Sequence, residues 1–144
     1  MQSARLVSTI VSLLAVLVAT AAPAQDTGNI QGAWTVVSAE RDAKPTAEVA
    51  EHRLTFSGDT FSIQHDAHAL YRGTYSVDPS RKPASIDFVH TEGTLKGKSW
   101  KGIYRLDGDA LRICDNAPSL AKPRPTQFSA TSGYICIIFK RATG

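Results

Sequence analysis

The chain has few of the residue patterns that reveal catalytic or metal chemistry. Its 144 residues include two cysteines and four histidines, and the histidines show neither HxH nor HExxH spacing. The G-x-S-x-G turn that presents a nucleophilic serine is missing, and no cysteine and histidine are spaced as a nucleophilic pair. We therefore predict that the protein is not an enzyme, and we assign it no catalytic residue and no cofactor.

A strong charge of one sign is also lacking. The chain has 16 lysines and arginines against 13 aspartates and glutamates, and its basic residues are scattered in short pairs. Electrostatic binding of nucleic acid needs a basic patch or stripe on one face of the protein. We therefore expect no nucleic-acid partner.

One long apolar run is present, near the N-terminus. Arg5 is followed by the almost entirely apolar or small segment Leu6 to Thr20, and then by Ala22-Pro23-Ala24, which has the A-x-A form of a signal-peptidase site. This order predicts a signal peptide over residues 1–24, whose removal leaves residues 25–144 as one secreted or periplasmic domain. The alternative is an uncleaved membrane anchor, but serines and threonines dilute the run of about 20 apolar residues that a spanning helix needs. We favour cleavage, and therefore no membrane attachment afterwards.

The rest of the chain consists of short runs in which apolar and polar residues alternate, with turn residues between them. No pattern of a long amphipathic helix separates these runs, which favours an all-β domain. We predict an eight-stranded antiparallel up-and-down barrel, because closure removes both exposed edges of the sheet. An open β-sandwich is the alternative. The predicted strands are residues 32–40, 54–56, 61–65, 71–77, 86–90, 100–106, 111–114 and 135–141.

The first and last of these strands carry the residues that we expect to close the barrel. Gly32 and Trp34 begin the first strand, and Arg141 ends the last one. We expect the Trp34 side chain to plug one end of the barrel, with the Arg141 guanidinium across its indole face. This cation–π arrangement is favourable and shields the ring from water.

The same residues carry a resemblance to known families. Gly32-x-Trp34 and Arg141 resemble the signature of the lipocalin-like (calycin) barrels, which implies a cavity for a small apolar molecule. More closely, the chain resembles a Planctomycetes-type uncharacterised lipocalin-like domain family over nearly all of residues 25–144. That resemblance implies a small exported barrel of unknown function and no catalytic residue. The matching segments are GAWTVVSAE at 32–40, LTFxGD at 54–59, GIYxLDGD at 102–109, LxIC at 111–114 and RPTxF at 124–128.

The two cysteines are most simply a disulfide if the protein is exported, and two buried free thiols are the alternative. If Ile113 faces Ile137 across the last two strands, Cys114 lies opposite Cys136 on the outer face of the barrel. Such a bridge closes the long loop of residues 115–133. We take it as structural rather than redox-active.

The up-and-down order also assigns the loops to the two ends of the barrel. The tight turns fall at the end plugged by Trp34, and the long loop falls at the open rim, where ligand contacts are useful. This assignment places His52, His65, His68 and His90 near the open rim. Imidazoles bind metals and haem, so a site formed by His65, His68 and His90 is one hypothesis. Solvated or hydrogen-bonded loop histidines are the alternative.

The inward-facing residues form either a filled core or a ligand cavity, because an eight-stranded barrel allows both. We predict a monomer that binds a small apolar molecule through its open end without catalysis. The alternative functions are a cell-envelope interaction or structural module with a filled barrel, and the histidine site described above. The predicted cavity residues are Val36, Phe56, Phe61, Ile63, Tyr75, Phe88, Tyr104, Ile113, Ile137 and Phe139.

Overall fold

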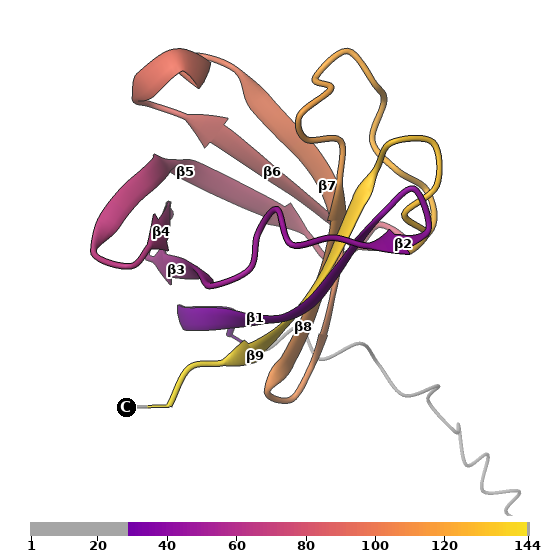
Figure 1. Ribbon diagram of the computed structural model, residues 1–144. Coiled ribbons are helices and arrows are strands. Elements are labelled where there is room, and N and C mark those ends of the chain that lie inside the picture. Colours follow the sequence, from indigo (N-terminus) through magenta and orange to yellow (C-terminus); the bar gives the residue numbers. More distant parts are fainter. Residues whose placement is uncertain (1–28, 144) are drawn as a thin grey trace, which may run out of the picture.

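The computed structural model describes residues 29–143, so the predicted signal peptide, residues 1–24, lies outside the described residues (Figure 1). The described part is built from β-strands and one short 3₁₀ helix. Within it, no helix has the length and apolar character that crossing a membrane requires. The elements are β1 (Gly32–Arg41), β2 (Lys44–Pro45), β3 (His52–Ser57), β4 (Thr60–His65), β5 (His68–Asp78), β6 (Ser85–His90), η1 (Gly93–Leu95), β7 (Ser99–Asp107), β8 (Ala110–Asp115) and β9 (Ile135–Arg141).

The strands form one antiparallel sheet that closes on itself. Each of the strands from β3 to β8 pairs with the next in the chain, and β1 pairs with both β3 and β9. In Figure 1 the first strand therefore lies beside the last. The two-residue strand β2 pairs only with the far end of β1. The predicted eight-stranded up-and-down barrel is thus confirmed, with β2 as one extra strand, and the open sandwich is not formed.

Trp34 occupies the closed end of the barrel, where its exposed fraction is 0%. Its Nε1 donates a hydrogen bond to the carbonyl of Ile30 at 2.8 Å. The Arg141 guanidinium lies over the indole, 4.4 Å from the ring centroid, and donates from Nε to Asp109 and from Nη1 to the carbonyl of Gln31. The plug is therefore tied to the chain entering β1 and to the turn between β7 and β8.

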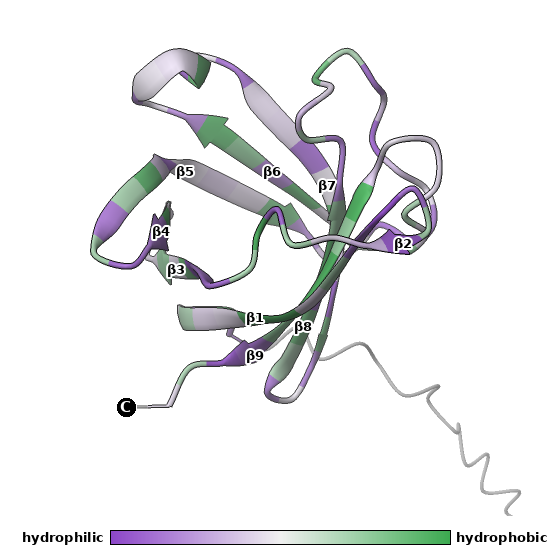
Figure 2. Ribbon diagram, viewed as in Figure 1, coloured by the Kyte–Doolittle hydropathy of each residue, from purple (hydrophilic) through white to green (hydrophobic). Residues whose placement is uncertain are grey.

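Aromatic side chains fill the barrel interior next to this plug. Phe56 contacts Tyr75 with ring centroids 4.5 Å apart, and Phe61 meets Phe88 edge to face at 5.0 Å. Gly73 makes room for this packing, because a Cβ there would lie 1.8 Å from the Val89 carbonyl oxygen and 2.9 Å from the Phe61 ring. Figure 2 shows hydrophobic residues interspersed with hydrophilic ones along the strands. Successive residues of a strand face opposite sides of the sheet, and these rings belong to the buried side.

A β-bulge interrupts this alternation in β1. The β1–β9 register shifts between Val36, which pairs with Phe139, and Ser38, which pairs with Ile138. The extra residue, Val37, is 58% exposed. Beyond the bulge the inward positions are therefore Ala39 and Arg41, and not Ser38 and Glu40 as strict alternation would have them.

The predicted disulfide between Cys114 and Cys136 is confirmed, and the two residues are direct partners across β8 and β9. The bridge is on the outer face but it is not exposed. Phe128 and Ala130 of the long β8–β9 connection pack over it. A structural disulfide is consistent with an oxidising compartment outside the cytoplasm.

The long connection is fastened to the barrel wall by Arg124. Its guanidinium donates to the carbonyls of Ile86 at 3.1 Å and Gly102 at 2.7 Å, and it forms an ion pair with Asp87 at 2.6 Å. The loop was predicted at the open rim. Its first part lies there, and its last residue, Gly133, returns to Arg41 at the cavity mouth. The part between them covers the outer wall from β6 to β9.

Replacing the plug tests the closure of the barrel. We expect Trp34→Ala to lower the free energy of unfolding by about 3–5 kcal/mol, because it removes a fully buried ring. Arg141→Ala should cost about 1–2 kcal/mol through the lost cation–π contact and hydrogen bonds. Urea unfolding monitored by circular dichroism measures both.

The neighbouring Lys140→Ala is the matched control, because Lys140 is exposed in the same strand. It should change the stability by no more than about 0.5 kcal/mol. Unchanged stability in Trp34→Ala would contradict the role of the plug.

Candidate functional site

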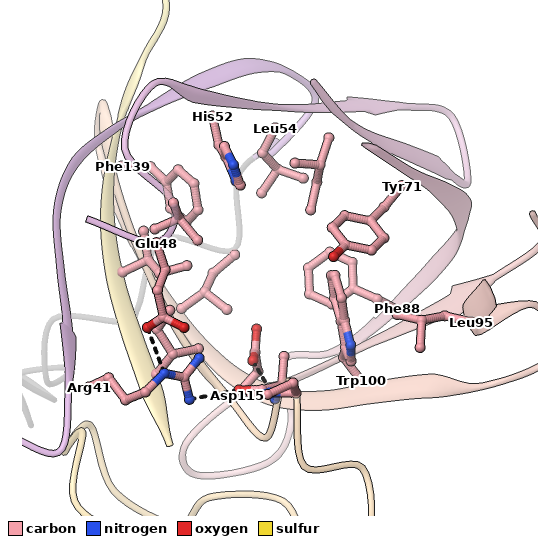
Figure 3. Close-up of a pocket in the computed structure, with 17 residues that line it drawn as sticks. Arg41, Glu48, His52, Leu54, Tyr71, Phe88, Leu95, Trp100, Asp115 and Phe139 are labelled. Carbon is pink, nitrogen blue, oxygen red and sulfur yellow. Dashed lines mark hydrogen bonds and ion pairs between the residues drawn. The ribbon is translucent and has the colours of Figure 1, made fainter. Parts of the chain in front are cut away.

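A cavity of about 230 Å³ lies inside the barrel at the end opposite Trp34 (Figure 3). Its walls are mainly apolar and come from strands all around the barrel, whereas polar side chains gather near its mouth. The loop before β3 and the start of the β8–β9 connection complete the rim. The lining residues are Arg41, Glu48, Val49, His52, Leu54, Ile63, Tyr71, Phe88, Leu95, Trp100, Ile113, Asp115, Ala117, Pro118, Ile135, Ile137 and Phe139.

The predicted cavity residues divide into two groups. Those that line the cavity are Ile63, Phe88, Ile113, Ile137 and Phe139. The others belong to the packed interior and do not line it, because aromatic rings fill the barrel next to the plug and leave space only towards the open end. For these five the cavity prediction is corrected: Val36, Phe56, Phe61, Tyr75 and Tyr104.

Arg41 reaches the mouth of the cavity because the bulge in β1 turns it inward. Its Nε donates to Glu48 Oε2 at 2.7 Å, and its Nη1 donates to the carbonyls of Ala117 at 3.0 Å and Gly133 at 2.7 Å. The hydrogen bond from Arg41 holds the pKa of Glu48 below its ordinary value. Arg41 thus joins the end of β1 to both rim loops, a role that the sequence pattern did not reveal.

Asp115 is the buried acid of the cavity, with an exposed fraction of 6%. Its Oδ1 accepts a hydrogen bond from the Ala117 N–H at 2.9 Å. Burial raises the pKa of Asp115 to about 7, against the opposing effects of this hydrogen bond and of the nearby Arg41 charge. In Figure 3 the carboxyl group points into the cavity. Alternation from Leu111 and Ile113 along the same strand is the signal that could have identified it.

The four histidines do not form one cluster, and they differ in burial and in their neighbours. His52 lines the cavity, and both its burial and the nearby His65, 5.7 Å away between ring centroids, lower its pKa. His65 and His68 are partners across the β4–β5 turn. His90 ends β6 beside the β6–β7 connection, does not line the cavity and is 1% exposed, with its ring 4.2 Å from that of Trp100.

This arrangement does not bring His65, His68 and His90 together. In the part of the chain that the structure describes, no group of three His, Cys, Asp or Glu residues could hold a metal ion. Burial lowers the pKa of His90, so its imidazole is neutral at pH 7. Among residues 29–143, neither ring nitrogen of His90 nor Trp100 Nε1 has a hydrogen-bond partner. His90 therefore serves as one more ring of the aromatic packing.

Comparison of the chain with protein-family models, with curated proteins and with solved structures finds no match. Its function is therefore inferred from the cavity.

The raised pKa of Asp115 predicts a pH dependence of stability. The folded protein retains a proton on this carboxyl up to about pH 7, whereas the unfolded chain releases it near the ordinary value of 3.8. Asp115 therefore stabilises the folded protein fully below about pH 3.8, and this stabilisation is lost as the pH rises to about 7. The loss lowers the free energy of unfolding by up to about 4 kcal/mol. Asp115→Asn should abolish this loss.

The measurement is urea unfolding of both proteins between pH 4 and pH 8. The lowered pKa values of His52 and His90 act in the opposite direction, but they are common to both proteins and cancel in the difference. The stability of Asp115→Asn relative to the native protein should rise from pH 4 to about pH 7 and level off above it. A difference that is independent of pH would contradict a buried, neutral Asp115.

Proposed function

We propose that the protein is an exported, non-catalytic carrier or receptor that binds a small, mainly apolar molecule inside the open end of its barrel. The observation that carries this proposal is the mainly apolar cavity bounded by the barrel strands. Preformed apolar concavities with a few polar groups are typical of small-molecule sites.

The size of the cavity limits the ligand. A cavity of about 150 Å³ in another protein accommodates benzene, so by proportion the 230 Å³ here suits a molecule of about nine non-hydrogen atoms. A long fatty chain is too large for this space. A substituted aromatic ring or a short branched hydrocarbon fits better.

The surroundings of the cavity favour a permanent site rather than a space that side chains could close. Phe88 in the floor is held by ring contacts to Phe56 and Phe61, and the walls belong to strands paired on both sides. Arg41 fixes the rim loops to β1. Such a cavity supports ligand binding over the alternative of a filled envelope module, and the separated histidines give no support to a metal or haem site.

Export is part of the proposal. The disulfide is consistent with an oxidising compartment, and the pattern of residues 1–24 is that of a signal peptide. The secreted or periplasmic location and the resemblance to the Planctomycetes-type family remain predictions.

Filling the cavity should abolish binding. We choose propylbenzene as the probe and compare Ile137→Phe, which adds volume inside the cavity, with Ile138→Phe, which makes the same change on the outer face one residue later. Propylbenzene should raise the melting temperature of the native protein and of Ile138→Phe but leave Ile137→Phe unchanged. Ile63→Phe, at a less buried part of the wall, is a second filling variant in case Ile137→Phe does not fold.

Native mass spectrometry of protein exported from the full-length chain provides an independent test. An organic mass that is lost on denaturation would identify the class of the natural ligand. A propylbenzene effect that persists in both filling variants, or no effect in the native protein, would overturn the proposed site.

A further inference from the structure

We propose that the ligand of this cavity carries a protonated amine, which binds the free oxygen of Asp115 while its apolar body fills the space beneath. This inference rests on the proposed function, and it adds the chemical class of the ligand.

The first support is the arrangement of the Asp115 oxygens. Oδ1 accepts the Ala117 N–H, but within residues 29–143 Oδ2 has neither a hydrogen-bond partner nor an ion-pair partner. The carboxyl group is nevertheless buried, and it points into the cavity in Figure 3. Oδ2 is not among the fully buried atoms that lack a partner, so this oxygen is open to the cavity and a donor on the ligand can reach it. In such a largely apolar space a hydrogen bond to a charged group is worth more than in water.

The second support is the balance of charge around the mouth. Arg41 could attract an anionic ligand, but its Nε and Nη1 already donate to Glu48, Ala117 and Gly133. Glu48 also neutralises its charge. An ionised Asp115 therefore leaves the mouth with one uncompensated negative charge, which favours a cationic group over an anionic one.

The third support is the aromatic wall that lines the same cavity as Asp115. Tyr71 and Trp100 line the cavity with their rings edge to face, 4.9 Å apart between centroids, and Phe88 lies 6.2 Å from Trp100. The negative faces of aromatic rings attract organic cations, and their large apolar surfaces cover an apolar body. The wall therefore suits both parts of a small amine.

Binding of such an amine depends on the ionisation of Asp115. The titratable or charged groups that share the cavity with it are Arg41 on β1, Glu48 before β3, His52 on β3 and Tyr71 on β5. Since the pKa of Asp115 is raised to about 7, its carboxylate form becomes dominant only above that pH. Amine affinity should therefore increase about tenfold from pH 6 to pH 8. The lowered pKa of His52 leaves it neutral over most of this range, and His52→Gln tests its contribution.

The decisive experiment compares three probes of equal size by isothermal titration calorimetry: 2-phenylethylamine, 2-phenylethanol and propylbenzene. At pH 8 the native protein should bind the amine about tenfold more tightly than the other two, as expected for a charge-assisted hydrogen bond. Asp115→Asn should abolish this preference but keep the propylbenzene affinity within about twofold. Glu51→Gln is the matched control, because it removes one negative charge from an exposed position at the same rim.

The outcomes separate the two proposals. If propylbenzene binds but the amine is not preferred, or if the preference survives in Asp115→Asn, the amine inference is wrong while the proposed function stands. An alcohol that binds as tightly as the amine would likewise overturn the need for a positive charge. If none of the three probes binds, both proposals fail. The pH dependence in the native protein provides the same test without a variant, and an amine affinity that does not change from pH 6 to pH 8 contradicts the inference.

Discussion

The pairing of β1 with β9 is the interaction on which the rest of the structure depends. It satisfies the backbone groups of both strands that an open sheet would expose, and it brings Arg141 over Trp34. It also turns the sheet into an enclosure with an inside. The packed aromatic region and the cavity are consecutive parts of the barrel interior. Large rings fill the interior next to Trp34, and they leave a cavity towards the open end.

A single extra residue in β1 decides the character of the open end. Without the bulge at Val37, Ser38 and Glu40 would face inward, and the mouth would carry an acid where it now carries Arg41. The bulge therefore supplies the cation that holds the rim loops and balances Glu48. Local backbone irregularity in this protein sets the chemistry of the site, whereas the regular strands set its shape.

The strands, the barrel order, the closing residues and the disulfide could be read from the sequence, because alternation and turn signals are local properties. The cavity was only partly predictable. The choice of inward residues that line it depends on the tilt of the strands and on the number of rings that fit beside Trp34. The positions of Phe56 and Tyr75 in the sequence predict neither. Arg41 was missed because the bulge has no clear sequence signature. The inward orientation of Asp115 could have been predicted, because it continues the alternation of Leu111 and Ile113 along β8.

The two tryptophans of the chain stand at opposite ends of the barrel interior. Trp34 is sealed in the plug, and Trp100 lines the cavity. Their intrinsic fluorescence therefore reports on separate events. Emission from Trp34 responds to loss of the fold, whereas emission from Trp100 also responds to what occupies the cavity. The native chain thus carries its own pair of optical reporters, one for integrity and one for occupancy, without any attached dye.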